Sequence, residues 1–439
     1  MEKRKGGRNY PKEKTRLMTA TGKRFWKIEK CRICGNKNLK SVINLGNLCL
    51  SGIFPKDKDT PVVTGPLELV KCHRQGKKEF CGLTQLRHSY NKHLLYGKTY
   101  GYRSGLNSSM VNHLKDVVNK VFRFVNLKKG DLIIDIGSSD GTLLGFYPQT
   151  KYKLAGIDPS ASKYKKFYPP GVKIINNFFF LQTITKTFGS QKAKIITSIA
   201  MFYDLENPLE FIKEITKVLD DKGVWVLEQS YLPLMLRVNA YDTICHEHTE
   251  YYCLRDIKWM LDRTGLKILD IELNDTNGGS FKLTVAKNSS PQKECTEVIQ
   301  KMLAKEQALG LDTLKPFIKF KKTILNHKKD LLELINKLIK QNKKIIGYGA
   351  STKGNIILQY CGLSSKQIPY IAEVNQDKFG CFTPKTHIPI ISEQQAKSLN
   401  PDYLLVFPWH FKDYFLIRER KFLKSGKHLI FPLPQILII

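Results

Sequence analysis

The densest group of acid–base side chains in the sequence lies in residues 241–252, where His246 and His248 flank Glu247. A neutral imidazole with an ordinary pKa of about 6.5 can remove a moderately acidic proton at neutral pH. Side chains two positions apart do not share a helix face, but in an extended segment they point the same way. We therefore expect a loop that directs both histidines into one pocket, with Glu247 binding a substrate hydroxyl or orienting an imidazole. The alternative is a pair of satisfied structural histidines.

A glycine turn after a short apolar run marks a candidate ligand site. Residues 132–144 read Leu-Ile-Ile-Asp-Ile-Gly-Ser-Ser-Asp-Gly-Thr-Leu-Leu, which predicts a buried strand, a turn and a helix. Glycines let the backbone approach a ligand closely, and a helix N-terminus offers free N–H groups. The turn carries no basic residue, and its spacing is neither that of dinucleotide enzymes nor that of a P-loop. It suits a nucleoside without a pyrophosphate, such as S-adenosylmethionine.

An acidic residue extends this candidate site. Asp158 ends the next predicted strand, about 20 positions past the first glycine, where an acid binds the ribose hydroxyls of a bound nucleoside. The alternative is that Asp158 caps a helix. The residues predicted to bind the cofactor are Asp135, Gly137, Ser138, Gly141, Asp158 and Asn177.

A second glycine-rich turn lies at residues 344–355, again between an apolar run and a helical pattern. It differs from the first turn because it carries a lysine, Lys353, shortly after Ser351. Hydroxyl and ammonium groups at a helix N-terminus favour a phosphate or pyrophosphate. Trp409 follows a later predicted strand and is expected at the same crevice. We predict that these three side chains bind substrate; the alternative is a purely structural domain.

Residues 98–107 crowd tyrosine, arginine, serine and asparagine together with two glycines and show no apolar period. A linker seldom carries two tyrosines and an arginine, so we expect a loop that faces the substrate. An ordinary connecting turn is the alternative. The substrate contacts predicted from this loop are Tyr100, Arg103 and Asn107.

The cysteines near the N-terminus have the pattern of a metal site. Cys31 and Cys34 form a Cys-x-x-Cys knuckle, and Cys72 and Cys81 follow. Zn²⁺ binds four thiolates tetrahedrally, and a knuckle supplies two of them from one tight turn. The pattern predicts a structural zinc site, because four protein ligands leave no position open for a substrate. His73 is a spare candidate ligand, and free buried thiols are the alternative to zinc.

From residue 131 onward, strand and helix patterns alternate, which predicts an α/β fold with a parallel sheet and ligand sites beyond the carboxyl ends of its strands. The strands are predicted at 132–136, 152–157, 172–175, 194–199, 224–228, 266–273 and 281–287. Seven strands that end in a hairpin resemble the class I methyltransferase fold. A second Rossmann-like unit is predicted after residue 344. The predicted division of the chain is a disordered basic tail at 1–27, a zinc-binding domain at 28–95, a methyltransferase domain at 96–290, and a helical connector with a C-terminal Rossmann-like domain at 291–439.

Composition limits the setting in which the protein works. The 439 residues carry a formal net charge of +33, which we interpret first as lysine accumulation on solvated faces. An anionic small substrate and nucleic acid are the alternatives. The sequence contains neither an apolar run of transmembrane length nor a signal peptide. We therefore expect a cytoplasmic protein with reduced thiols and no membrane partner.

Taken together, these motifs resemble those of the sugar C-methyltransferase family from about residue 31 to the end. Each motif alone is weak, but their order and spacing together are specific. The motifs that carry the resemblance are Cys31-x-x-Cys34 with the later cysteines, residues 100–107, the turn at 135–141, Met201-Phe-Tyr-Asp-Leu-Glu206, His246-Glu-His248 and residues 347–354.

The resemblance implies a zinc-binding region, a class I methyltransferase domain and a C-terminal Rossmann-like domain. It implies methylation, with S-adenosylmethionine, of a carbon next to the ketone of a nucleoside-diphosphate sugar, as in deoxysugar biosynthesis. A base would remove the acidified proton, and the resulting enolate would attack the methyl group. By resemblance His248 is this base, and Glu247 and Tyr102 hold the sugar and the enolate oxygen. His246 is predicted to belong to the same catalytic group, and Tyr241 is predicted to contact the substrate. A zinc-containing nucleic-acid methyltransferase is the alternative.

Overall fold

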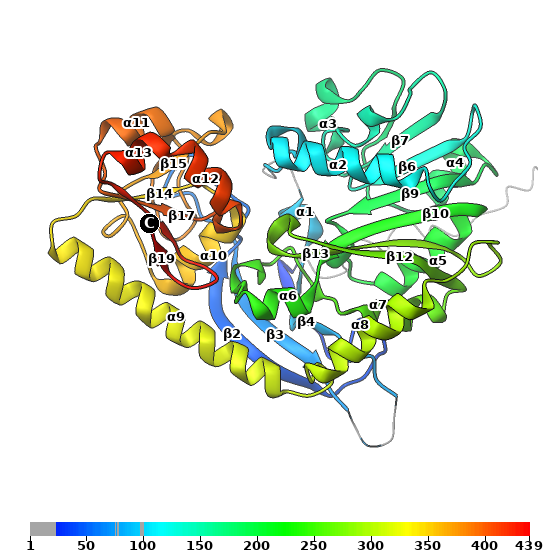
Figure 1. The fold of residues 1–439 in the computed structure, drawn as a ribbon, viewed down its shortest axis with the longest axis horizontal. Helices are drawn as coiled ribbons and strands as arrows, with labels where there is room; N and C mark the ends of the chain where they lie inside the picture. The colour runs from blue at the N-terminus through cyan, green and yellow to red at the C-terminus, as the bar shows by residue number, and fades with distance from the viewer. Residues whose placement is uncertain (1–22, 75, 77–78, 97–100) are drawn as a thin grey trace, which may run out of the picture.

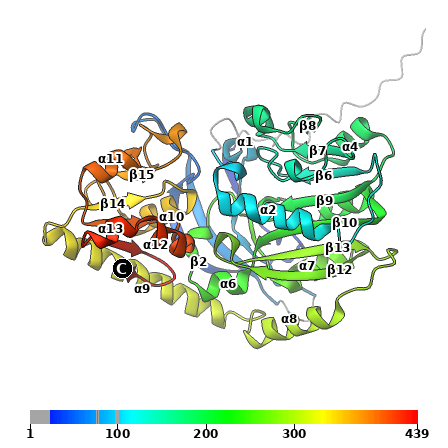
Figure 2. The same cartoon turned by 45° about the horizontal axis from the view of Figure 1, so that its top comes forward.

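The computed structural model describes residues 23–74, 76, 79–96 and 101–439. Figure 1 shows two α/β lobes, one around β6 (Leu132–Ile136) and the other around β14 (Ile345–Tyr348), with the long strands β2 (Leu39–Cys49) and β3 (Thr64–Cys72) below and between them. In the turned view of Figure 2, the long helix α9 (Lys315–Lys340) runs beneath the second lobe toward the first. Across the described residues, no helix is long and apolar enough to cross a membrane.

The larger sheet confirms the predicted fold class. Its strand order is β12-β13-β10-β9-β6-β7-β8, and every neighbouring pair is parallel except those that include β13. This is the class I methyltransferase order, and the seven predicted strands all occur, with ends that differ by a few residues. Besides β6, the strands are β7 (Lys153–Ile157), β8 (Lys173–Ile175), β9 (Ala193–Ile199), β10 (Leu219–Ser230), β12 (Leu266–Asn274) and β13 (Ser280–Lys287).

Helices cover both faces of this sheet, which explains why β6 is buried along its whole length. On one face lies α2, whose buried residues Met110, Leu114, Val117 and Val121 recur every three or four positions and pack on the strands. On the other face, the second core of the domain contains residues of α4, α5 and α7. The helices of this domain are α2 (Ser108–Val121), α3 (Ala161–Tyr164), α4 (Leu181–Phe188), α5 (Pro208–Val218), α6 (Leu232–Arg237) and α7 (Leu254–Asp262).

The N-terminal region forms a four-stranded sheet, β11-β4-β3-β2, that includes a strand from much later in the chain. That strand, β11 (Glu250–Tyr251), pairs with β4 (Thr84–Leu86) immediately after the histidine loop. A separate pair joins β1 (Phe25–Lys27) to β5 (His88–Tyr90), and α1 (Lys92–Leu95) follows. Ordered structure therefore begins before residue 28, inside the segment predicted as a tail.

The C-terminal domain is a second Rossmann-like sheet in the order β16-β15-β14-β17-β18-β19, parallel except for β19. Helix α9 joins it to the rest, because Phe317, Phe320 and Ile324 belong to one core with residues of β2, β3 and the C-terminal sheet. The remaining elements are α8 (Thr296–Ala308), α10 (Thr352–Cys361), β15 (Ile371–Glu373), β16 (Ile390–Ser392), α11 (Glu393–Ser398), β17 (Tyr403–Val406), α12 (Lys412–Arg418), α13 (Arg420–Lys424), β18 (His428–Phe431) and β19 (Leu437–Ile438).

Candidate active site and metal centre

The first glycine turn lies at the carboxyl end of β6 and is packed on a tyrosine. Gly137 and Gly141 adopt φ values of +75° and +77°, which residues other than glycine rarely adopt. A Cβ on Gly141 would lie 2.7 Å from the ring of Tyr168, and the Tyr168 hydroxyl lies 2.7 Å from Ser138 Oγ. Ser138 therefore helps to fix the turn. Sequence reasoning missed Tyr168, because nothing local marks a tyrosine that packs under a turn about 30 residues away.

The acids of this site are buried and bonded to the protein. Asp135 accepts a hydrogen bond of 2.5 Å from Thr197, and burial raises the pKa of Asp135 to about 7. Asp158 accepts bonds from the Ser139 N–H and from the N–H and hydroxyl of Ser160, at 2.6–2.9 Å. A carboxylate has about four acceptor positions, so one stays open for a ribose hydroxyl. Asp158 therefore bonds the backbone ahead of α3, as a helix cap would, and keeps an acceptor position for a ribose hydroxyl.

The role of Asn177 at the cofactor stays a prediction. Asn177 follows β8 and is exposed, and its side-chain oxygen accepts a hydrogen bond of 2.8 Å from the N–H of Phe178. With no basic residue in the turn, the residues that fit a nucleoside are the two glycines and the two acids. S-adenosylmethionine supplies an electrophilic methyl group when it is bound there.

Replacing Gly141 with alanine is expected to lower the stability of the protein by about 2–4 kcal/mol, because backbone strain and overpacking against Tyr168 add. The affinity for S-adenosylmethionine should fall at least about tenfold, which calorimetric titration would measure. Gly130→Ala is the matched control: its φ is +86°, but a Cβ there meets nothing within 4 Å. Gly130→Ala should lower the stability by about 1–2 kcal/mol and leave the affinity for S-adenosylmethionine unchanged. Normal binding by Gly141→Ala would contradict the assignment of the turn.

The two histidines of the loop do not share a pocket, which corrects the expectation from their spacing. His246 is fully buried against the N-terminal region, edge-on to Tyr90 with 4.7 Å between ring centroids. Burial lowers the pKa of His246 to about 4, although backbone groups of Gly65 and Leu48 oppose the shift. His248 instead lies against Tyr203, with 4.2 Å between ring centroids. The loop is irregular, so the two side chains leave it in different directions.

His248 has the geometry of a general base. Its Nδ1 lies 3.0 Å from the carbonyl oxygen of Thr243. A carbonyl can only accept, so Nδ1 carries the proton and Nε2 keeps its lone pair. Burial, together with the positive charge of Lys353, lowers the pKa of His248 to about 3. The imidazole is therefore neutral at pH 7 and remains half-buried rather than sealed.

The carboxyl group of Glu247, the residue before His248, lies against Gly52. A Cβ on Gly52 would come within 2.7 Å of Glu247 Oε1, so the carboxyl group covers that glycine. Its Oε2 is buried and has no partner among the residues the structure describes, and burial raises the pKa of Glu247. Tyr96 donates a hydrogen bond of 3.3 Å to the backbone carbonyl of Glu247. A buried carboxyl oxygen without a partner is suited to binding a substrate hydroxyl.

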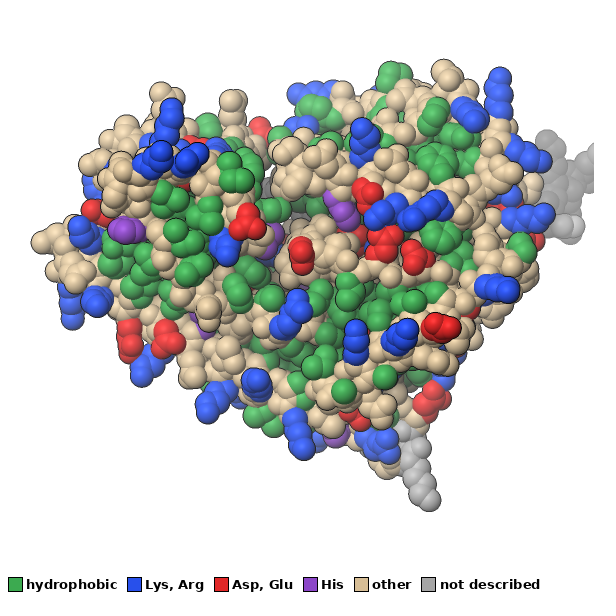
Figure 3. Space-filling view, in the orientation of Figure 1, with side chains coloured by type: hydrophobic (Ala, Val, Ile, Leu, Met, Phe, Trp, Pro, Cys, Tyr) green, Lys and Arg blue, Asp and Glu red, His purple; other side chains and the backbone are tan. Residues whose placement is uncertain are grey.

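Contacts from the C-terminal domain reach this loop. Lys353 at the start of α10 donates a hydrogen bond of 2.6 Å to the carbonyl of Asn277, at the tip of the hairpin between β12 and β13. Trp409 donates a bond of 2.8 Å from its indole nitrogen to Asp242, shortly before the histidines. Ser351 caps α10 by accepting a bond of 3.0 Å from the Gly354 N–H. Figure 3 shows histidine side chains in the hollow between the two lobes.

Two predicted substrate residues use their polar side chains within the protein. Tyr241 is completely buried, and its hydroxyl lies 3.1 Å from His327 Nδ1 on α9, so it belongs to the core. Asn107 is the N-cap of α2 and accepts a hydrogen bond of 3.0 Å from the Ser109 N–H. Both contacts have the same cause: a polar side chain is first used to satisfy nearby protein groups.

The loop before α2 contacts the glycine turn. Arg103 Nε lies 3.4 Å from Asp140 Oδ2, and its guanidinium lies 3.5 Å from the ring centroid of Phe167. The role of Arg103 as a substrate contact stays a prediction. Tyr102 is 47% exposed. Tyr100 lies outside the described residues.

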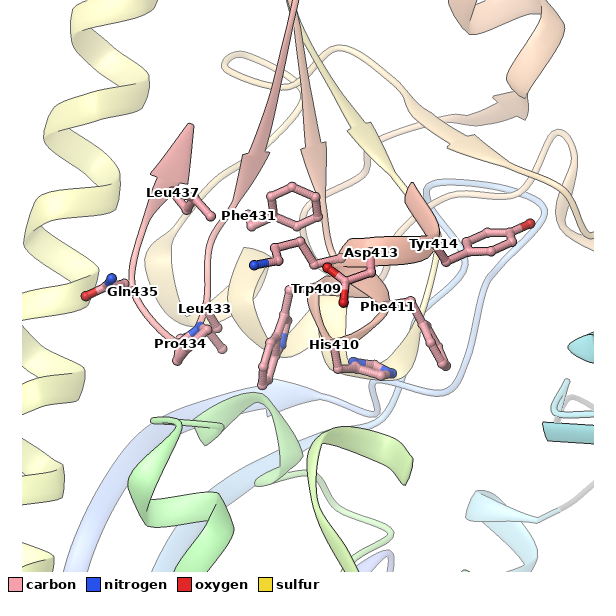
Figure 4. Close-up of a pocket in the computed structure, with 11 residues that line it drawn as sticks. Trp409, His410, Phe411, Asp413, Tyr414, Phe431, Leu433, Pro434, Gln435 and Leu437 are labelled. Carbon is pink, nitrogen blue, oxygen red and sulfur yellow. The ribbon is translucent and has the colours of Figure 1, made fainter. Parts of the chain in front are cut away.

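A cavity of about 490 Å³ opens in the C-terminal domain beyond the carboxyl ends of β17 and β18. Figure 4 shows that Trp409 and Phe431 line it from two neighbouring strand ends, with Leu433 and Pro434 from the return to β19. Its wall also includes Lys412 and His410, and burial lowers the pKa of His410. The sequence predicted Trp409 and the neighbouring His410 at this crevice.

The four predicted zinc ligands come together. The sulfur atoms of Cys31, Cys34, Cys72 and Cys81 all lie within 4.8 Å of one another. Two of the separations are 3.5 and 3.6 Å, close to the edge of about 3.8 Å expected for a tetrahedron with Zn–S bonds of about 2.3 Å. N–H groups of Asn36, Gln85 and Leu83 point at the sulfurs at 3.1–3.4 Å. The donor set fits Zn²⁺, and His73 is not part of it.

Three family models match the chain in series: a zinc binding domain at residues 31–96, a methyltransferase domain at 107–271 and a C-methyltransferase C-terminal domain at 275–434. The chain therefore combines a zinc-binding domain, a methyltransferase domain and a C-methyltransferase C-terminal domain, and it is a methyltransferase that depends on S-adenosylmethionine. Among known relatives, it is similar to the C-methyltransferase NovU of Streptomyces niveus, with 28% identity over 93% of this chain and 96% of NovU.

Solved structures resemble the chain only in part. A S-adenosylmethionine-dependent methyltransferase from Clostridium acetobutylicum has 14% identity and a TM-score of 0.31, covering 40% of this chain and 92% of its own. The mitomycin 7-O-methyltransferase MmcR has 12% identity and a TM-score of 0.33, covering 42% of this chain and 55% of its own.

Proposed function

We propose that the enzyme methylates a carbon next to the ketone of a nucleoside-diphosphate keto sugar. The observation that carries the proposal is His248, a neutral imidazole with a free Nε2 between a nucleoside-type turn and a second, lysine-bearing turn. Methylation of carbon needs a carbanion equivalent, and removing the proton next to a ketone is the mildest way to form one. The described site offers the base for this step.

The proposed chemistry assigns each proton. His248 Nε2 takes the proton from the carbon, and the electron pair of the C–H bond moves into an enolate. The enolate carbon then forms the new bond to the methyl group as the bond from that methyl to sulfur breaks, and the ketone is restored. The proton on His248 leaves to solvent. Glu247, with its unpartnered oxygen, is the proposed contact for a sugar hydroxyl.

Charge at the second turn supports an anionic substrate. Lys353 is half-buried, and its positive charge lowers the pKa of His248. A bound diphosphate would offset that charge, so the pKa of His248 would rise and the imidazole would become a better base when substrate is present. The aromatic cavity beyond β17 and β18 has room for the base and ribose of the nucleotide.

The test is a panel of nucleoside-diphosphate keto sugars incubated with isotopically labelled S-adenosylmethionine. We expect mass spectrometry to find one labelled methyl group on the sugar, bound to carbon. The same sugars with the ketone reduced to an alcohol are the control and should gain no label, because their C–H is not acidic. Label on the reduced sugars, or on oxygen, would contradict the proposal.

The nucleic-acid alternative has less support. On the face shown in Figure 3, Lys and Arg side chains are scattered rather than gathered in one stripe, unlike the usual footprint of a nucleic-acid surface. Labelled RNA and DNA belong in the same experiment. Methyl transfer to either, with affinity that falls steeply with salt, would favour that function instead.

A further inference from the structure

We propose that Arg32, inside the zinc knuckle, is a positioning residue that holds the loop of His248 in place through Glu250. The inference deepens the proposed function, because it rests on His248 as the base. It links the metal centre to catalysis. Bound zinc would hold the Cys31–Cys34 turn in shape, this turn orients the Arg32 side chain, and Arg32 contacts the segment that carries the imidazole of His248. Nothing in the pattern Cys-Arg-Ile-Cys itself indicates this role.

Arg32 is almost entirely buried and uses its guanidinium to join two domains. Its side chain is 3% exposed, and Nε lies 3.6 Å from Glu250 Oε1 and 3.9 Å from Glu206 Oε2. The other guanidinium nitrogens donate hydrogen bonds of 2.7 Å to the Leu86 carbonyl and to Ser89 Oγ. The Arg32 guanidinium thus faces two carboxyl groups of the methyltransferase domain from within the metal-binding turn, and burial raises the pKa of one of them, Glu250.

A second contact ties the same carboxylate strand to the metal ligands. Gln85, the partner of Glu250 in the pairing of β4 with β11, donates a hydrogen bond of 3.1 Å to Cys31 Sγ. Its side-chain oxygen accepts a bond of 3.1 Å from the Arg32 N–H. The side chains of Gln85 and Arg32 therefore connect the knuckle to β4 and β11.

From Glu250 the contacts continue to the proposed base. Thr249 donates from its hydroxyl to Glu250 Oε2 at 2.7 Å, and its N–H donates 2.8 Å to the carbonyl of Tyr203. Tyr203 is the residue whose ring lies against His248. The imidazole of His248 therefore lies against Tyr203, and the backbone of Tyr203 is in turn bonded to Thr249, next to Glu250.

The segment needs side-chain anchors because its backbone pairing is minimal. Strand β11 has two residues, Glu250 and Tyr251, and pairs with Gln85 and Thr84 of β4. A register shift of one residue in a strand moves every side chain to the opposite face. The contacts of the buried Glu250 carboxyl group with Arg32 and Thr249 oppose such a shift, since the shift would leave both without their partner on β11.

The test compares Arg32→Gln with Arg32→Lys, which keeps the charge. Arg87→Gln is the matched control, because Arg87 lies in the same region and pairs with Glu68 at 3.8 Å without contacting the histidine loop. For Arg32→Gln we expect kcat to fall about 10–100-fold, the loss typical of a misplaced catalytic group. Zinc content and the dissociation constant of S-adenosylmethionine should change less than about twofold. Arg32→Lys should recover most of kcat, and Arg87→Gln should match the unmodified enzyme.

Hydrogen–deuterium exchange supplies a readout that does not depend on activity. Arg32→Gln should speed exchange in residues 245–252, whereas Arg87→Gln should not. Glu250→Gln is the second variant: it should reproduce the faster exchange, and the double variant with Arg32→Gln should be no worse than either single one. Unchanged exchange and kcat in folded, zinc-loaded Arg32→Gln would overturn the inference. Faster exchange together with full activity of His248→Asn would instead overturn the base assignment and leave the link between Arg32 and the loop standing.

Discussion

Replacing His248 with asparagine is expected to lower the rate of methyl transfer by about 10²–10⁴-fold, the usual contribution of a general base. Asparagine keeps a polar side chain of similar reach but has no group that can accept a proton at neutral pH. Because the glycine turn lies on β6 and the histidine lies in the loop before β11, binding of S-adenosylmethionine should survive. Labelled-methyl assays would measure the rate and calorimetry the binding.

His428→Asn is the control for this experiment. His428 begins β18 in the C-terminal sheet and stacks on Tyr403, with 5.1 Å between ring centroids. Its replacement should leave the rate of methyl transfer within about twofold of the unmodified enzyme, as for surface changes away from the site. If His248→Asn retained full activity, another group would have to be the base.

The protonation of His248 can be followed directly by imidazole NMR. Its pKa, lowered to about 3 by burial and by Lys353, means that the resonance should stay in the neutral form from pH 7 down to about 4. Adding a nucleoside diphosphate should move this pKa upward, because the anion offsets Lys353. Below the ordinary value of about 6.5 the unfolded chain binds more protons than the folded one at this site. The stability contributed by neutral His248 is therefore present above pH 6.5 and is lost as the pH falls toward about 3.

Loss of a zinc ligand is expected to have the largest effect on stability. Cys81→Ser should reduce the metal content from about one zinc ion per chain to near zero, because serine is a poor ligand for Zn²⁺. The free energy of unfolding should fall by more than about 4 kcal/mol. Single substitutions rarely have so large an effect, but loss of a bound metal is one of the causes. Methyl transfer should be lost as well, since β4 and the knuckle hold the segment after His248.

Cys49→Ser separates metal loss from the general cost of changing a buried cysteine. Cys49 is also buried, but its sulfur lies 3.0 Å from Thr64 Oγ1 and is outside the cluster. This variant should keep its zinc and lose about 1 kcal/mol. Elemental analysis and thermal unfolding would measure both quantities. Full zinc content in Cys81→Ser would show that the four sulfurs are not the site.

Much of the architecture could be predicted because its signals are local. A short apolar run that ends in glycine specifies a buried strand and a turn, and repetition of that pattern specifies a parallel sheet. The strand predicted at residues 132–136 matches β6 residue for residue. The zinc ligands were also predictable, because a metal demands particular donor atoms whatever the fold around them.

By itself, therefore, the sequence determined the sheets, the two turns, the four thiolates and a short list of reactive side chains. Only the tertiary structure decided which of those side chains are available. It buried His246 on Tyr90 and Tyr241 on His327, used Asn107 as a cap, and left His248 with a free Nε2. The reason is physical: availability depends on hydrogen bonds and packing between residues far apart in the chain, and no local pattern records which polar group another segment will already have satisfied.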